Sequence, residues 1–129
     1  ELSSASEIRL PLLWIAVLHG RLKCSLAATR GVQTGVEVIK YVMAGADAVM
    51  TTSALLRNGV GHMKTLLDGM TGWMERRGYD SVKQMKGSMS QLKVGDPSAF
   101  ERANYIKVLQ SYKSPYIEPL GHAPAAAQR

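Results

Sequence analysis

The apolar residues between positions 6 and 20 recur at the spacing of an α-helix, which predicts a helix with one apolar face. The set, at i, i+3, i+4, i+7 and i+8, is Leu10, Leu13, Trp14, Val17 and Leu18. Pro11 then has to lie in the first turn, where its missing N–H costs least. A buried strand is the competing interpretation, and Pro11 counts against it.

Two short apolar stretches, residues 23–28 and 46–51, predict buried β-strands covered on both faces. Between them, Thr34 and Glu37 match a T-x-x-E capping box, which predicts a helix that begins at Thr34. Gly45 stands where a C-terminal helix cap belongs. The order strand–loop–helix–strand is that of a βαβ unit, with parallel strands and a right-handed crossover.

Helices are predicted throughout the rest of the chain. Residues 53–57 form a short helical turn, and a long amphipathic helix ends at Gly78. Ser81 and Gln84 match a second capping box, and Asp96 followed by Pro97 begins a helix that runs to about residue 112. The apolar face of the long helix consists of Met63, Leu66, Leu67, Met70, Trp73 and Met74. Residues 114–129 contain three prolines, and we expect a poorly ordered tail there.

Composition excludes several classes of protein. The 129 residues carry a formal net charge of +6, but the basic residues are scattered, so nucleic-acid binding is not expected. No apolar run approaches the ~20 residues of a membrane span, and no signal peptide is expected. The single cysteine, Cys24, cannot form an internal disulfide, which favours a cytoplasmic setting. His19, His62 and His122 lack ligand-like spacing, so no metal site is expected.

The chemistry of the chain is expected in the loops that follow the two predicted strands. In a parallel unit, the loops at residues 28–32 and 51–54 emerge at the same edge of the sheet. Gly31 lets the backbone approach a ligand, and Ser53 starts a helical turn whose free N–H groups favour an anion. Together the two loops predict a phosphate site. A second interpretation is purely structural: Gly31 serves a tight turn, and Thr51, Thr52 and Ser53 cap a helix.

Four segments resemble, in order, the end of the dihydroorotate dehydrogenase family. Residues 23–32 and AGADAVMTTSALLRNG, residues 44–59, resemble its last two βα units. GYDSVKQMKGSMSQ, residues 78–91, is similar to the segment after its last barrel helix. DPSAFERANYIKVLQSY, residues 96–112, is similar to the tail of a bacterial subgroup called dihydroorotate dehydrogenase-like proteins. The resemblance implies an FMN-dependent TIM-barrel oxidoreductase of pyrimidine biosynthesis.

The resemblance also implies which residues bind the FMN phosphate. A Gly-Gly pair of the family corresponds to Arg30 and Gly31, and a Gly-Thr pair corresponds to Thr52 and Ser53. Arg30 and Thr52 each replace a glycine. The Arg30 side chain either pairs with the phosphate or faces solvent. No catalytic residue is assigned: the family's base comes from a middle strand, and Cys24 is expected to be a small buried residue of the first predicted strand.

The expected fold is therefore α/β: the C-terminal portion of a (β/α)8 TIM barrel, with its last two strands and a helical C-terminal tail. Residues 1–91 form the barrel units, 92–113 a helical extension and 114–129 the tail. The substrate, dihydroorotate or a related dihydropyrimidine, would bind largely through parts of the barrel outside this chain. The isolated chain is expected to be inactive, and to be either marginally stable or associated with other copies. Two alternatives remain open: a non-redox barrel fragment that binds a phosphorylated metabolite, and a small basic helical binding module.

Overall fold

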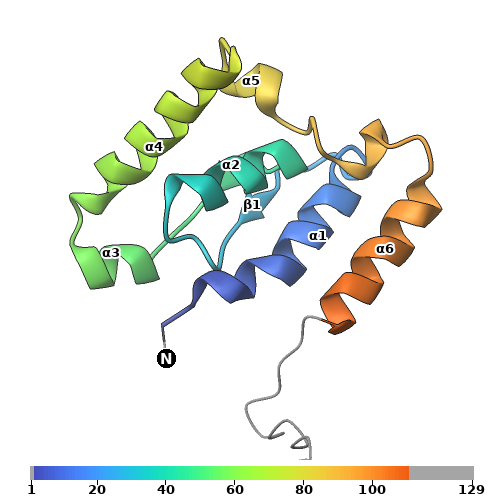
Figure 1. Cartoon of the computed structure of the whole chain (residues 1–129), viewed down its shortest axis with the longest axis horizontal. Coiled ribbons are helices and arrows are strands. Elements are labelled where there is room, and N and C mark those ends of the chain that lie inside the picture. Colours follow the sequence, from blue (N-terminus) through green and yellow to red (C-terminus); the bar gives the residue numbers. More distant parts are fainter. Residues whose placement is uncertain (1, 111–129) are drawn as a thin grey trace, which may run out of the picture.

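A computed structural model describes residues 2–110 and shows a mostly helical chain with one small sheet (Figure 1). The first half contains the 3-10 helix η1 (Ala5–Ile8), α1 (Arg9–Leu18), β1 (Ala27–Ala28), α2 (Gly35–Ala44) and β2 (Ala48–Val49). The second half contains α3 (Ser53–Asn58), α4 (His62–Arg77), α5 (Val82–Met85), the 3-10 helix η2 (Gln91–Lys93) and α6 (Pro97–Gln110). The predicted tail, residues 114–129, lies outside the described residues.

The expected fold, a portion of a TIM barrel, is wrong for this structure. β1 and β2 pair in parallel, as predicted, with Ala27 opposite Ala48 and Ala28 opposite Val49. Each strand is only two residues long, however, and helices dominate the described part of the chain. Ala27 and Ala48 are exposed, so the strands are not covered on both faces as a barrel strand would be. Three of the four strand residues are alanines, whose small side chains bury little apolar surface.

Helix α2 is the central element, with α1 against one side and α4 against the other (Figure 1). Its start is as predicted, because the Thr34 hydroxyl accepts from the Val36 N–H and Glu37 accepts from the Thr34 N–H at 2.8 Å. One core cluster, which includes Ile15, Ala28 and Tyr41, joins α1, β1 and α2. A second cluster around Met85 joins α2, α4 and α5.

Helices α2 and α4 touch at backbone distance. A Cβ on Gly35 would lie 2.9 Å from both the Leu66 carbonyl oxygen and the Met70 nitrogen, so no larger residue fits there. On α4, Leu66 is buried, and Met70, Trp73 and Met74 are partly buried. The predicted apolar face is therefore only partly a core face, because Met63 and Leu67 are more than half exposed.

The predicted end of α4 and the predicted start of α6 are confirmed, whereas the predicted end of the last helix, near residue 112, lies outside the described residues. Gly78 adopts a left-handed conformation, φ 71°, at the end of α4. The Asp96 carboxylate accepts from the N–H groups of Ser98 and Ala99 at 2.9 and 3.0 Å, which caps the start of α6. Within residues 2–110, every helix is too short or too polar to cross a bilayer.

Candidate functional site

The loops after β1 and β2 lie beside each other and line a common hollow of about 240 Å³. The hollow also has a third wall, the N-terminal segment with Leu2 and Ser3. Of the four residues expected to bind phosphate, Arg30, Thr52 and Ser53 line it, and Gly31 does not. The remaining lining residues are Thr29, Val32 and Thr51.

Arg30 and Gly31 share an unusual backbone conformation. Both lie in the left-handed region, Arg30 at φ 78° and Gly31 at φ 70°. A non-glycine residue pays a steric cost there, of roughly 1–2 kcal/mol, because its Cβ approaches the following carbonyl oxygen. Among the described non-glycine residues, Arg30 alone has a positive φ. The backbone at position 30 therefore has a conformation suited to glycine.

Gly31 itself does not face the hollow. A Cβ at this position would lie 2.6 Å from the Ile8 nitrogen and 2.8 Å from the Ile8 Cβ. Residue Ile8 of η1 therefore occupies the side of Gly31 on which a side chain would stand, and phosphate binding by the Gly31 backbone stays a prediction. Gly31 makes room for the N-terminal helix and supports the turn.

The hydroxyl of Tyr41 stabilises the turn at Arg30 and Gly31. It donates to the carbonyl oxygens of Thr29, at 3.0 Å, and Arg30, at 2.9 Å. Burial of the ring raises the pKa of the Tyr41 hydroxyl to about 12, so it remains a donor at neutral pH. Thr51 joins the two loops, because its hydroxyl donates to the Val32 carbonyl at 2.9 Å.

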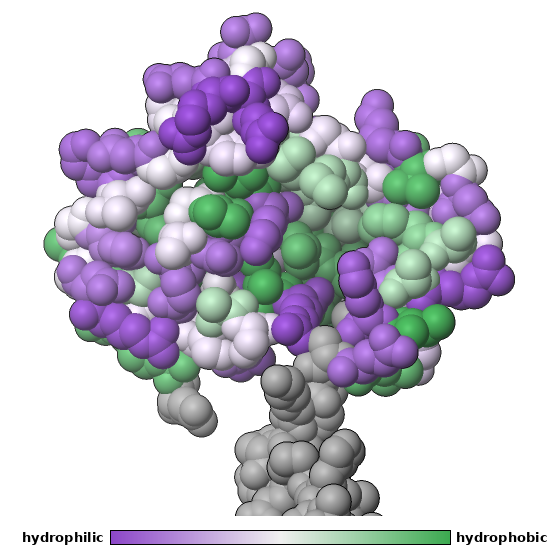
Figure 2. All heavy atoms as spheres, in the orientation of Figure 1, coloured by the Kyte–Doolittle hydropathy of each residue, from purple (hydrophilic) through white to green (hydrophobic). Residues whose placement is uncertain are grey.

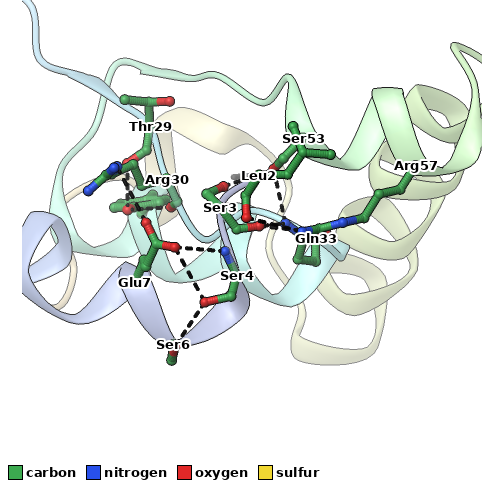
Figure 3. Close-up of polar contacts among 11 residues, drawn as sticks. Leu2, Ser3, Ser4, Ser6, Glu7, Thr29, Arg30, Gln33, Ser53 and Arg57 are labelled. Atoms are coloured by element: carbon green, nitrogen blue, oxygen red, sulfur yellow. Dashed lines mark hydrogen bonds and ion pairs between the residues drawn. The ribbon is translucent and has the colours of Figure 1, made fainter. Parts of the chain in front are cut away.

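Gln33, Ser53 and Arg57 form a polar network at one side of the hollow (Figure 3). The Gln33 amide donates to the Ser53 hydroxyl at 3.1 Å, and Arg57 donates to the Gln33 side-chain oxygen at 3.1 Å. The side chains of Gln33 and Arg57 also donate to the Ser3 carbonyl, at 3.1 Å and 2.8 Å respectively. The network fixes the N-terminal segment against the two loops.

This network was missed by sequence reasoning. Gln33 directly follows the first loop, and Arg57 lies one turn after Ser53, so their positions were a usable signal. What the sequence did not reveal is their common partner, the Ser3 backbone, which lies 30 and 54 positions away along the chain.

The three hydroxyl groups of residues 51–53 do not cap α3. Those of Thr51 and Ser53 are bound across the loops, to Val32 and to Ser3 and Gln33. Thr52 makes no capping hydrogen bond within the described part of the chain, and its side chain is exposed at the hollow. The purely structural interpretation therefore does not account for these residues through helix capping.

Arg30 pairs with Glu7 of η1, with 3.5 Å between Nε and a carboxylate oxygen (Figure 3). A hydrogen bond from the Ser4 N–H, with the nearby Arg30 charge as a smaller cause, lowers the pKa of Glu7. The pair is largely solvent-exposed, so it contributes little to stability and its partners can exchange. The Arg30 guanidinium therefore lies at the rim of the hollow, paired with Glu7 near the surface and not buried inside.

Cys24 lies outside both the strand and the hollow. It was expected to be buried within the first strand, and this expectation is wrong: the thiol is exposed, and β1 begins at Ala27.

Comparison with known proteins gives one informative similarity. No protein-family model matches the chain. The chain is 25% identical over 67 residues to the chloroplastic dihydropyrimidine dehydrogenase (NADP(+)) of Arabidopsis thaliana. The match covers 52% of this chain but only 16% of that protein. The similarity indicates a distant relation to an oxidoreductase, and the chain spans a small part of the relative's length.

Proposed function

We propose that the chain supplies the phosphate-binding loops of an FMN-dependent oxidoreductase that acts on dihydroorotate or a related dihydropyrimidine. The observation that carries this proposal is the hollow shared by the loops after two parallel strands, with Arg30, Thr52 and Ser53 in its wall. The relative's name, a dihydropyrimidine dehydrogenase, agrees with this substrate class. The positive φ of Arg30 is also consistent with the resemblance, which places a glycine there.

The size and donor set of the hollow suit a phosphate group. Its volume of about 240 Å³ is below the range of roughly 300–1,000 Å³ typical of whole-ligand pockets. We therefore assign it to the phosphate end of the cofactor and not to the flavin ring. The Thr52 hydroxyl would donate to a phosphate oxygen, and the first N–H groups of α3 would face the anion. The Arg30 guanidinium would leave Glu7 and pair with the phosphate.

FMN, when bound, would supply the hydride chemistry, while the residues described here bind and orient its phosphate. Ser53 would act as a positioning residue, because its hydroxyl is held by Ser3 and Gln33 and fixes the start of α3. Tyr41 would keep the first loop in its turn.

Thr52→Asp tests the proposal most directly, since Thr52 is exposed and lies outside the polar network of Gln33, Ser53 and Arg57. An added carboxylate ~4 Å from a phosphate oxygen costs at least ~1 kcal/mol even with the dielectric of water. The affinity for FMN, titrated by flavin fluorescence, should fall by at least about fivefold. Thr65→Asp, on the exposed side of α4, adds the same charge elsewhere and should leave the affinity unchanged.

Riboflavin and ribose 5-phosphate complete the design. Riboflavin lacks the phosphate, so its binding should not respond to Thr52→Asp. Equal loss of FMN and riboflavin affinity would place the phosphate elsewhere. Since the hollow is assigned to the phosphate and not to the flavin ring, ribose 5-phosphate should compete with FMN, and its affinity should fall by the same factor in Thr52→Asp.

A further inference from the structure

A second and larger cavity, of about 470 Å³, lies among α1, α2 and α6. It shares no lining residue with the hollow at the strand ends. Its volume falls within the range of small-molecule sites, roughly 300–1,000 Å³. The wall that α6 contributes comes from the helical extension, which has no part in the proposed phosphate site.

The surface of this cavity is mainly apolar. The apolar lining residues are Leu12, Leu13, Ala16, Ala44, Met89 and Phe100. Phe100, on α6, packs against the core cluster of α1 and α2. Figure 2 shows hydrophobic residues in the middle of this face of the molecule, with hydrophilic residues around them. The cavity therefore offers an apolar surface of limited extent.

Among the described residues, the charged ones that line the cavity are all cationic. They are Arg9 on α1, Lys40 on α2 and Lys107 on α6, so each wall contributes one. The carboxylate nearest to Lys40 is that of Glu37, at 4.0 Å on the same helix. A ligand that enters between these helices thus meets three cationic side chains and the Asn104 amide, with apolar surface elsewhere.

We propose that this cavity binds a small amphiphilic carboxylate, that is, a medium-chain fatty acid. The apolar chain would lie against Leu12, Leu13 and Phe100, which would remove its surface from water. The carboxylate would pair with Lys40 and Lys107, which line the cavity from α2 and from α6. A fatty acid would contact both the apolar surface and the cationic side chains of the cavity, whereas an uncharged apolar ligand would contact only the apolar surface favourably.

Calorimetric titration of the chain with octanoate tests this assignment, with 1-octanol and butyrate as probes of the two halves of the ligand. Octanoate should bind at least tenfold more tightly than either. The double variant Lys40→Gln, Lys107→Gln should abolish the preference of octanoate over octanol while leaving octanol binding unchanged. Lys83→Gln, on α5 and outside the cavity, is the matched control and should have no effect.

A variant of the apolar wall separates this site from adsorption to other exposed apolar residues. Leu13→Gln should weaken octanoate and octanol alike, whereas Leu67→Gln on the exposed side of α4 should weaken neither. The proposal is overturned if octanoate fails to bind at millimolar concentration, or if its affinity is the same in the double lysine variant. It is also overturned if Leu67→Gln lowers the affinity as much as Leu13→Gln does.

Discussion

At position 30, the glycine variant should be more stable than the alanine variant, which reverses the usual order of stability of these two residues. In most positions alanine is the more stable choice, because glycine gains more freedom on unfolding. At φ 78°, however, alanine retains the clash of its Cβ with the backbone, and glycine does not. Both substitutions remove the ion pair with Glu7 equally, so the loss of that pair cancels in the comparison.

The expected difference follows from two opposing contributions. Relief of the left-handed conformation favours glycine by roughly 1–2 kcal/mol. The greater freedom of glycine in the unfolded chain opposes this by roughly 0.5–1 kcal/mol. At mid-range values, the free energy of unfolding of Arg30→Gly should therefore exceed that of Arg30→Ala by roughly 0.75 kcal/mol.

Urea denaturation followed by circular dichroism measures this difference. Lys64 supplies the control pair, since it lies in α4 with an exposed side chain and ordinary helical backbone. There, glycine should be less stable than alanine by ~1 kcal/mol. If Arg30→Ala proves as stable as Arg30→Gly, or more so, the left-handed turn is not present in solution, and the account of the first loop is wrong.

Three further predictions concern the turn, the sheet and its edges. Tyr41→Phe removes the hydroxyl that donates to the Thr29 and Arg30 carbonyls. The free energy of unfolding should therefore fall by about 1–3 kcal/mol, and FMN binding should weaken. An unchanged denaturation curve would contradict this prediction. Hydrogen bonds from Lys86 and the Leu26 N–H hold the pKa of Asp47 below its ordinary value of 3.8. The ionised Asp47 therefore stabilises the fold above pH 3.8, and this stabilisation is lost as the pH falls through the lowered pKa. The stability difference between wild type and Asp47→Asn should therefore be constant near neutrality and shrink in acid, as measured by denaturation at several pH values; a difference that persists in acid would refute the role of the charge. Within residues 2–110, each strand pairs on one side only, so sedimentation should show concentration-dependent self-association, and a strict monomer at all concentrations would count against it.

Local chemistry made the helix boundaries predictable. The bonds between Thr34 and Glu37, and those of Asp96 with the next turn, involve residues two or three positions apart. Such contacts depend on spacing that the sequence displays directly. The same holds for Gly78, whose backbone freedom ends α4.

The overall architecture was not predictable in this way. The short apolar stretches of a parallel strand and of a loop between helices look alike, and only two residues of each stretch pair. Exposure was also misjudged, because periodicity indicates a face but not whether another element covers it. Met63 and Leu67 have the spacing of core residues, yet no neighbour in the described chain buries them.

The candidate site was found only in part because it is built from three segments and not two. The strand-end loops were visible as a pair, since both follow apolar stretches and contain small polar residues. The third wall, Leu2 and Ser3, has no motif of its own. Arg57 holds it through the carbonyls of both residues, at 3.2 and 2.8 Å, and Gln33 adds a bond to Ser3. A change at Arg57 should therefore open the hollow at its N-terminal wall while the bonds of Tyr41 and Thr51 still hold the two loops, which makes this arginine a positioning residue of the proposed phosphate site.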